Sequence, residues 1–104
     1  MEYKLLIDGQ WVGGGAELEV KNKYNGEIIG VLPTARKEDL DTALAAAERA
    51  EDVMADMPAH KRASILLRTA ELMRERADDL AKTVAAEAGK ALKFARAEVD
   101  RAAS

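Results

Sequence analysis

Over the first third of the chain, apolar and polar residues alternate or form short apolar runs, and this pattern predicts β-strands. Two dipeptides typical of hairpin turns, Asp8-Gly9 and Asn25-Gly26, fall between these runs. Pro33 follows the last run and is expected to end the β region. The predicted strands, taken in pairs, are residues 4–7 with 10–12 and residues 18–21 with 27–32.

In the rest of the chain, apolar residues recur every three or four positions, which predicts three amphipathic helices. The first covers residues 37–55 and carries Glu38 and Asp39 in its first turn, where the helix dipole favours negative charge. Pro58 suits the first turn of a second helix, which continues until Gly89 supplies a left-handed C′ residue. A third helix follows this glycine. The three apolar stripes consist of Leu40, Ala43, Leu44, Ala47, Ala50 and Met54; Ala63, Leu66, Leu67, Ala70, Met73, Ala77, Leu80 and Val84; and Leu92, Ala95, Val99 and Ala102.

The third stripe meets no stop signal before Ser104, so we expect residues 1–104 to be a single fragment of a longer protein. Within it, residues 1–33 are assigned to strands and turns and residues 34–104 to helices. The predicted fold class is therefore α+β and mostly helical. Alanine accounts for 21 of the apolar residues and buries little area, so a core formed by this chain alone is expected to be thin.

Composition and charge exclude several classes of function. The formal net charge of −3 argues against a general nucleic-acid binder, which normally carries a basic field. The absence of Cys excludes disulfides, thiolate metal sites and a cysteine nucleophile, and a single His cannot form a histidine metal site. No apolar run approaches the roughly 20 residues of a membrane span, and the N-terminus lacks the apolar core of a signal peptide. We therefore expect no nucleic-acid partner, no membrane partner and a cytoplasmic location.

The residues offer little that could carry chemistry. His60, beside Lys61 and Arg62, could be a general base or an anion contact, but a solvated residue in the first helical turn is the favoured interpretation. Residues 13–15 are three glycines, but a phosphate cradle would open into a helix, and a strand comes next here, so a flexible turn is favoured. Three charged residues are expected on one outer helical face at i,i+4 spacing: Arg74, Asp78 and Lys82. The pattern alone predicts no catalytic and no cofactor-binding residue.

Five short strings succeed one another along the chain: Ile-Asp-Gly-Gln-Trp at 7–11, Asn-Lys-Tyr-Asn-Gly-Glu-Ile-Ile-Gly at 22–30, Glu-Asp-Leu-Asp-Thr-Ala at 38–43, Pro-Ala-His-Lys-Arg-Ala-Ser-Ile-Leu at 58–66, and Glu-Ala-Gly-Lys at 87–90 with Glu-Val at 98–99. Together they closely resemble the opening of the NAD(P)-dependent aldehyde dehydrogenases. The resemblance covers essentially the whole chain. Lys23 and Ala91 depart from it, because the family has Pro at both positions, and each replacement loses a fixed φ.

The resemblance implies the N-terminal part of the Rossmann-like nucleotide-binding domain of such an enzyme. The parent would oxidise an aldehyde to the acid through a Cys thiohemiacetal, with NAD or NADP as hydride acceptor. Its substrate could be lactaldehyde, succinate semialdehyde or glyceraldehyde 3-phosphate. Because the chain lacks the catalytic Cys and Glu and the family's Gly-rich cofactor loop, we expect it to be a structural, inactive segment that binds no cofactor itself.

The resemblance also implies a metal site. Many family members bind a structural monovalent cation through the two residues before the Asn of the Asn-Pro loop and through the acidic residue before x-Gly-Lys. These positions correspond here to Val20, Lys21 and Glu87. Backbone carbonyls supply much of that coordination, so the side chains of Val and Lys do not forbid it. A further ligand would lie beyond Ser104, so the ion is expected in the full-length parent only.

A second hypothesis is an independent small helical module for interaction or oligomerisation. Its wide, Ala-rich helix faces would then bury against a partner helix. In either case the exposed apolar faces are expected to make the chain a homo-oligomer, whereas an aldehyde substrate is expected for the parent alone. An in-frame continuation that carries a Cys would favour the dehydrogenase, and an immediate stop codon would favour the module.

Overall fold

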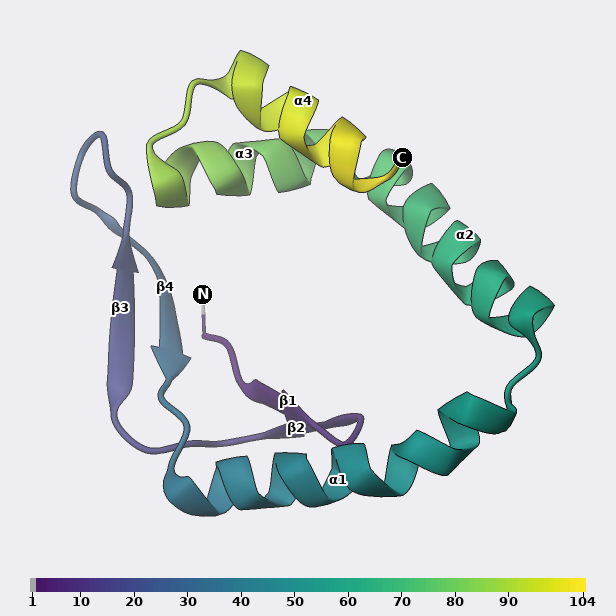
Figure 1. Cartoon of the computed structure of the whole chain (residues 1–104). Helices are drawn as coiled ribbons and strands as arrows, with labels where there is room; N and C mark the ends of the chain where they lie inside the picture. Colours follow the sequence, from purple (N-terminus) through teal and green to yellow (C-terminus); the bar gives the residue numbers. More distant parts are fainter. Residues whose placement is uncertain (1) are drawn as a thin grey trace. The chain divides into compact units, whose positions relative to one another are not determined.

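The computed structural model describes residues 2–104, which form four short strands and then four helices (Figure 1). The chain divides into two compact units: the first contains residues up to 20 and residues 28–57, and the second contains residues 21–27 and 58–104. The elements are β1 (Leu5–Ile7), β2 (Gln10–Val12), β3 (Glu17–Lys21), β4 (Ile28–Pro33), α1 (Lys37–Asp56), α2 (Ala59–Glu75), α3 (Ala77–Ala88) and α4 (Leu92–Ala102).

The first unit begins with the predicted hairpin. β1 and β2 pair antiparallel, with Leu6 opposite Trp11 in the middle of the register. Asp8 has a φ of 51° and Gly9 a φ of 71°. Two successive positive φ angles are those of a type I′ turn, whose twist matches that of the flanking strands. The Asp-Gly dipeptide therefore predicted both the turn and its position.

β3 and β4 form a second two-stranded sheet, in which the two strands run in opposite directions (Figure 1). The glycine segment before β3 lies close to the end of β4: the amide of Gly15 donates to the carbonyl of Thr34 at 2.7 Å. A Cβ on Gly14 would lie 2.5 Å from that same carbonyl oxygen. The interpretation of residues 13–15 as a flexible turn is therefore incomplete, because close backbone packing requires glycine here.

The start of α1 is held by the side chain of a residue in its first turn. The amide of Arg36 donates to Oδ2 of Asp39 at 2.8 Å, and its guanidinium donates to both carboxylate oxygens of the same residue. Farther along α1, Arg49 pairs with Asp8 of the hairpin turn at 2.9 Å, so the helix and the hairpin are joined within the first unit. The predicted bounds of 37–55 agree with the observed helix to within one residue.

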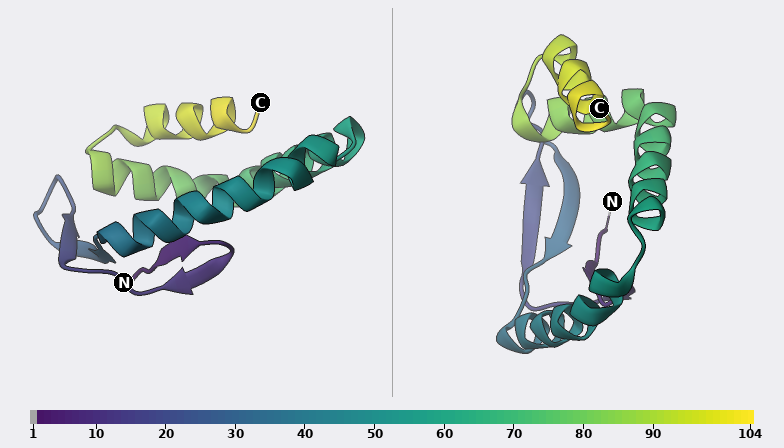
Figure 2. Two further views of the ribbon diagram at one scale, coloured as in Figure 1. Left: turned by 60° about the horizontal axis from the view of Figure 1, so that its bottom comes forward. Right: turned by 45° about the vertical axis from the view of Figure 1, so that its right-hand side comes forward.

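The second unit is built on α3 and α4, which lie side by side in both views of Figure 2. Its core consists of Ala81, Ala95 and Val99, and no described residue with a larger side chain is fully buried. Small residues bring the two helix backbones close together, but each buries little apolar area. The expectation of a thin core is therefore correct.

The second predicted helix is wrong as a continuous element, because it breaks at Arg76 into α2 and α3. Arg76 has φ −108° and ψ 16°, outside the helical range, although its amide still donates to the carbonyl of Leu72. The break also separates the expected i,i+4 neighbours: Arg74 contacts Ala103, and Asp78 pairs with Arg96 of α4. The apolar spacing continues through Arg76, so it could not reveal a one-residue change of direction.

Candidate functional site

An apolar groove lies between α2 and the C-terminal end of α4, with a volume of about 340 Å³. On the α2 side, Leu66 is 70% exposed and Leu67 is 66% exposed, whereas Ala70 and Met73 are partly buried. Large aliphatic side chains left in water favour contact with another apolar surface. The groove is lined by Leu66, Leu67, Thr69, Ala70, Met73, Arg74, Ala102, Ala103 and Ser104.

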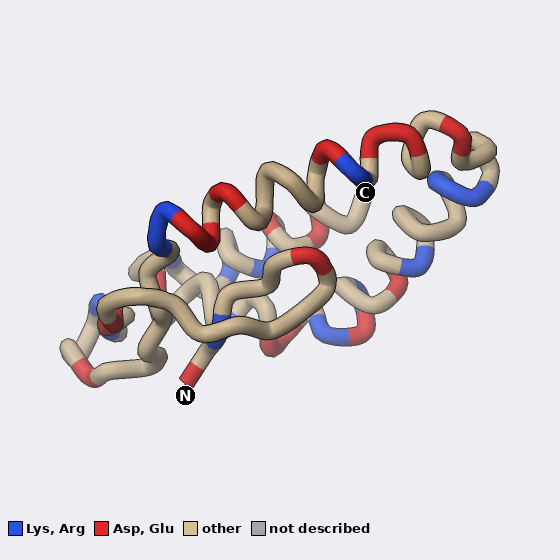
Figure 3. Tube along the Cα trace, turned by 90° about the horizontal axis from the view of Figure 1, so that it is seen from below, with Lys and Arg blue, Asp and Glu red and all other residues tan. Residues whose placement is uncertain are grey.

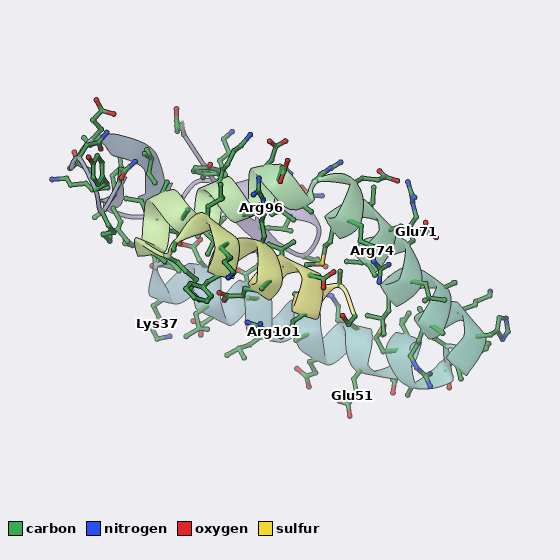
Figure 4. The ribbon with its side chains drawn as sticks, turned by 90° about the horizontal axis from the view of Figure 1, so that it is seen from above. Lys37, Glu51, Glu71, Arg74, Arg96 and Arg101 are labelled. Carbon is green, nitrogen blue, oxygen red and sulfur yellow. The ribbon has the colours of Figure 1, made fainter. Side chains whose placement is uncertain are left out.

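Arg74 joins the two helices that form this groove. Its Nη2 donates to the carbonyl oxygen of Ala103 at 2.6 Å, in a partly buried position (Figure 4). The carbonyl groups at a helix C-terminus carry partial negative charge, so a guanidinium there stabilises α4. Arg74 also lines a second hollow of about 240 Å³, together with Val99 and Arg96 of α4. Sequence reasoning missed this role, because the partner is a backbone carbonyl, which no side-chain pattern reveals.

α1 also carries exposed large apolar side chains in the first unit: Leu40, Leu44 and Met54 on one face, and Val53 on the opposite side. Charged residues occupy other positions of the same helix (Figure 3), for example Lys37, whose Nζ lies 2.8 Å from Oδ2 of Asp41. An amphipathic helix with its apolar side chains in water lacks a covering partner among the described residues. None of the helices in residues 2–104 is both long enough and apolar enough to cross a membrane.

A cleft of about 570 Å³ with a mixed polar and apolar lining lies between the first hairpin and the start of α1. Arg36 and Asp39 form part of its wall, and Asp39 is buried. The hydrogen bonds from the Arg36 side chain, together with the weaker effect of the one from its amide, hold the pKa of Asp39 below its ordinary value. Because both Asp39 oxygens already accept hydrogen bonds from Arg36, this pair caps the helix and is not poised for proton transfer.

The residues predicted to bind a cation lie in both units. Val20 and Lys21 are the last two residues of β3, and Glu87 is an exposed residue near the end of α3. The carbonyl of Lys21 already accepts a hydrogen bond from Nζ of Lys23 at 3.0 Å. Among the described residues, no group of three or more His, Cys, Asp or Glu is arranged to hold a metal ion. The cation site stays a prediction for the whole protein.

His60 lies where the favoured interpretation placed it, exposed in the first turn of α2. Within residues 2–104 it has no carboxylate or hydroxyl partner among the hydrogen bonds and ion pairs of the structure, so nothing prepares it for acid–base work. The three glycines at 13–15 lead into β3, and no helix N-terminus comes directly after them. They therefore do not form a phosphate cradle.

Known proteins of one family match nearly the whole of this chain. The pattern of the aldehyde dehydrogenase family matches residues 11–104. The chain is 37% identical over 97 residues to the lactaldehyde dehydrogenase of Methanocaldococcus jannaschii, covering 93% of this chain and 21% of that protein. It is 40% identical over 100 residues to malonate-semialdehyde dehydrogenase 1 of Geobacillus kaustophilus, covering 94% and 20%.

Among solved structures, the NADP-dependent glyceraldehyde-3-phosphate dehydrogenase of Bacillus halodurans, complexed with NADP, matches 99% of this chain and 22% of that one. The TM-score is 0.95 at 27% sequence identity. The chain thus spans about a fifth of the length of the proteins that it matches. Since the family pattern extends over nearly all of its residues, the chain belongs to the aldehyde dehydrogenase family and corresponds to an N-terminal segment of it.

Proposed function

We propose that these residues serve as a supporting segment of an NAD(P)-dependent aldehyde dehydrogenase. The observation that carries the proposal is the family match over residues 11–104. The segment holds no Cys, so the nucleophile of the reaction is supplied by the rest of the subunit. Its contribution is structural: it packs against the rest of the nucleotide-binding domain and covers it.

The exposed apolar faces support this role. Leu66 and Leu67 on α2, and Leu40 and Leu44 on α1, expose more than half of their surface. Contiguous apolar patches of more than a few hundred Å² on a soluble protein usually mark an interaction site. The relatives carry roughly four-fifths of their length outside the matched segment, which provides a covering surface of the same polypeptide.

The whole enzyme is proposed to oxidise a short polar aldehyde to the acid. A Cys thiohemiacetal would transfer hydride to NAD or NADP, and hydrolysis of the thioester would release the acid. The relatives support this substrate class, because their names refer to lactaldehyde, malonate semialdehyde and glyceraldehyde 3-phosphate. Succinate semialdehyde belongs to the same class. A cytoplasmic location stays a prediction.

Reconstitution from two parts tests the proposal. The lactaldehyde dehydrogenase of M. jannaschii would be produced without its matching segment and mixed with this chain. Neither part alone is expected to reduce NAD(P) in the presence of an aldehyde, whereas the mixture is expected to do so. The enzyme's own segment, supplied as a separate chain, is the positive control. Restoration by that segment but not by this chain, or turnover by this chain alone, would contradict the proposal.

A surface variant makes the test specific for the apolar face. Leu66→Glu combined with Leu67→Glu should abolish reconstitution, because both side chains would have to enter an apolar contact as charges. Both residues are exposed in this chain, so the variant is expected to keep its helical circular dichroism. Lys61→Glu, an exposed change on another face of α2, is the matched control and should reconstitute normally.

A further inference from the structure

The loop between β3 and β4 contains both asparagines of the chain, Asn22 and Asn25. The amide of Asn22 donates to the carbonyl of Glu27 at 2.8 Å, and the amide of Gly26 donates to the carbonyl of Asn22 at 2.9 Å. Each asparagine also accepts a hydrogen bond on Oδ1 from the amide two residues later, at 2.8 Å from Tyr24 and at 3.1 Å from Glu27. The two side chains therefore adopt the same local turn.

The two asparagines differ in the residue on their C-terminal side and in their exposure. Asn22 is half-buried and precedes Lys23, a residue with a Cβ next to the intervening peptide group. Asn25 is exposed and precedes Gly26, which has a φ of 75° and open space where a Cβ would stand. A backbone nitrogen flanked by a glycine Cα is the least hindered one that the chain could place beside an amide side chain.

We propose that Asn25 is a site of spontaneous covalent modification, through attack of the backbone nitrogen of Gly26 on Cγ of Asn25. The new bond joins that nitrogen to Cγ, and the bond from Cγ to Nδ2 breaks. Ammonia leaves with the two Nδ2 hydrogens and the proton from the Gly26 amide, so a cyclic succinimide remains. Water then opens the ring at one of its two carbonyls, which gives either Asp at position 25 or an isoaspartyl linkage.

One neighbouring group stabilises the tetrahedral intermediate of this step, and a second orients the side chain. The amide of Glu27 donates to Oδ1 of Asn25, the oxygen that gains negative charge when Cγ becomes tetrahedral. The carboxylate of Glu27 accepts a hydrogen bond at 2.9 Å from Nδ2, the nitrogen that leaves. These two contacts fix the orientation of the Asn25 side chain beside the Glu27 backbone. The hydrogen bond from the Gly26 amide to the carbonyl of Asn22 has to open first, and it belongs to an exposed turn, where local opening costs little.

The modification would weaken the contact between the β3–β4 loop and α3. An isoaspartyl linkage routes the main chain through Cβ and Cγ and adds one negative charge to the loop. The same loop contacts α3, because the amide of Lys23 donates to the carbonyl of Ala86 at 3.1 Å. The side chain of Lys23 also lies 3.0 Å from where a Cβ on Gly89 would stand. A longer main chain two residues away weakens this contact between the loop and the end of α3.

The two asparagines provide an internal comparison in the unchanged protein. The full chain would be incubated at neutral pH, and loss of each amide would be followed by peptide mapping with mass spectrometry, with hydroxylamine used to trap the succinimide. Asn25 is expected to react at least about tenfold faster than Asn22, a ratio equivalent to about 1.4 kcal/mol in barrier height. Equal rates, or faster reaction at Asn22, would overturn the proposal.

A variant of Gly26 tests whether its backbone nitrogen is the attacking group. Gly26→Ala should slow the reaction at Asn25 by about tenfold and leave the rate at Asn22 unchanged. An unchanged rate at Asn25 would overturn the proposed attack.

Asn25→Asp carries the charge of the product without the longer main chain. Hydrogen exchange at the Lys23 amide should accelerate in the isoaspartyl product relative to this variant. Equal exchange in the two would overturn the proposed loosening of the loop.

Discussion

At Gly89 the backbone has a φ of 69°, and its amide donates to the carbonyl of Ala85 as α3 ends. The position was predicted from the single glycine in the helical part of the chain, because a residue without a Cβ adopts this conformation at little cost. A Cβ here would also lie 3.0 Å from that of Lys23. A residue with a side chain at this position would therefore suffer both backbone strain and crowding against Lys23.

Gly89→Val should therefore lower the free energy of unfolding by about 1–3 kcal/mol. The denaturant midpoint, measured by circular dichroism, reports the change. Gly13→Val is the control, because a Cβ there meets nothing within 4 Å and its φ is not positive. Equal midpoints for Gly89→Val and the unchanged protein would show that no left-handed residue is needed at this position.

The Arg36–Asp39 pair predicts a dependence of stability on pH. Its hydrogen bonds lower the pKa of Asp39 in the folded chain below the ordinary value of 3.8, so folding favours the ionised carboxylate. The resulting stability is present above the ordinary pKa and is lost as the pH falls through the lower folded value. Asp39→Asn should therefore flatten the fall in denaturant midpoint between about pH 5 and about pH 2.

Arg36→Met is expected to remove much of the same pH dependence, since it deletes the side-chain donors of this pair. The double variant should then resemble either single one. If the two single effects simply added, the pH dependence of Asp39 would not arise from Arg36.

At the scale of elements, both two-strand pairs and the start and end of α1 could be predicted from turn dipeptides and apolar spacing, because those signals are local. The break at Arg76 could not, since the apolar stripe continues across it. For the groove beside α2, the sequence predicted only an exposed apolar helix face and not the groove itself. The link that Arg74 makes across it depends on the carbonyl of Ala103, which is distant in sequence.

The contact between α3 and α4 depends on small side chains. Ala81 and Ala95 are fully buried between the two helices, so a larger residue at either position has no space. Ala81→Leu should lower the free energy of unfolding by about 1–3 kcal/mol through overpacking. Ala97→Leu, at an exposed position of α4, is the matched control and should stay close to the unchanged protein in a thermal melt. A stabilised Ala81→Leu variant would mean that the contact contains an unfilled cavity.

For the molecule as a whole, the exposed faces of α1 and α2 predict self-association when the chain is studied alone. Aliphatic side chains such as Leu66 and Leu44 would be covered by a second copy in the absence of other partners. Sedimentation equilibrium should show an apparent mass that rises above 11.3 kDa with concentration. Leu66→Glu combined with Leu67→Glu should reduce this rise. A mass that stays at the monomer value at high concentration would contradict the prediction.

The β1–β2 hairpin carries the only tryptophan of the chain, and Trp11 is 67% exposed. Indole emission shifts to longer wavelength in water, so this residue is a built-in optical reporter for the first unit. The isolated chain should fluoresce like a hydrated indole, and urea should change the emission maximum little. Any complex that covers the hairpin would shift the emission to the blue, so association at this surface could be followed in real time with no attached label.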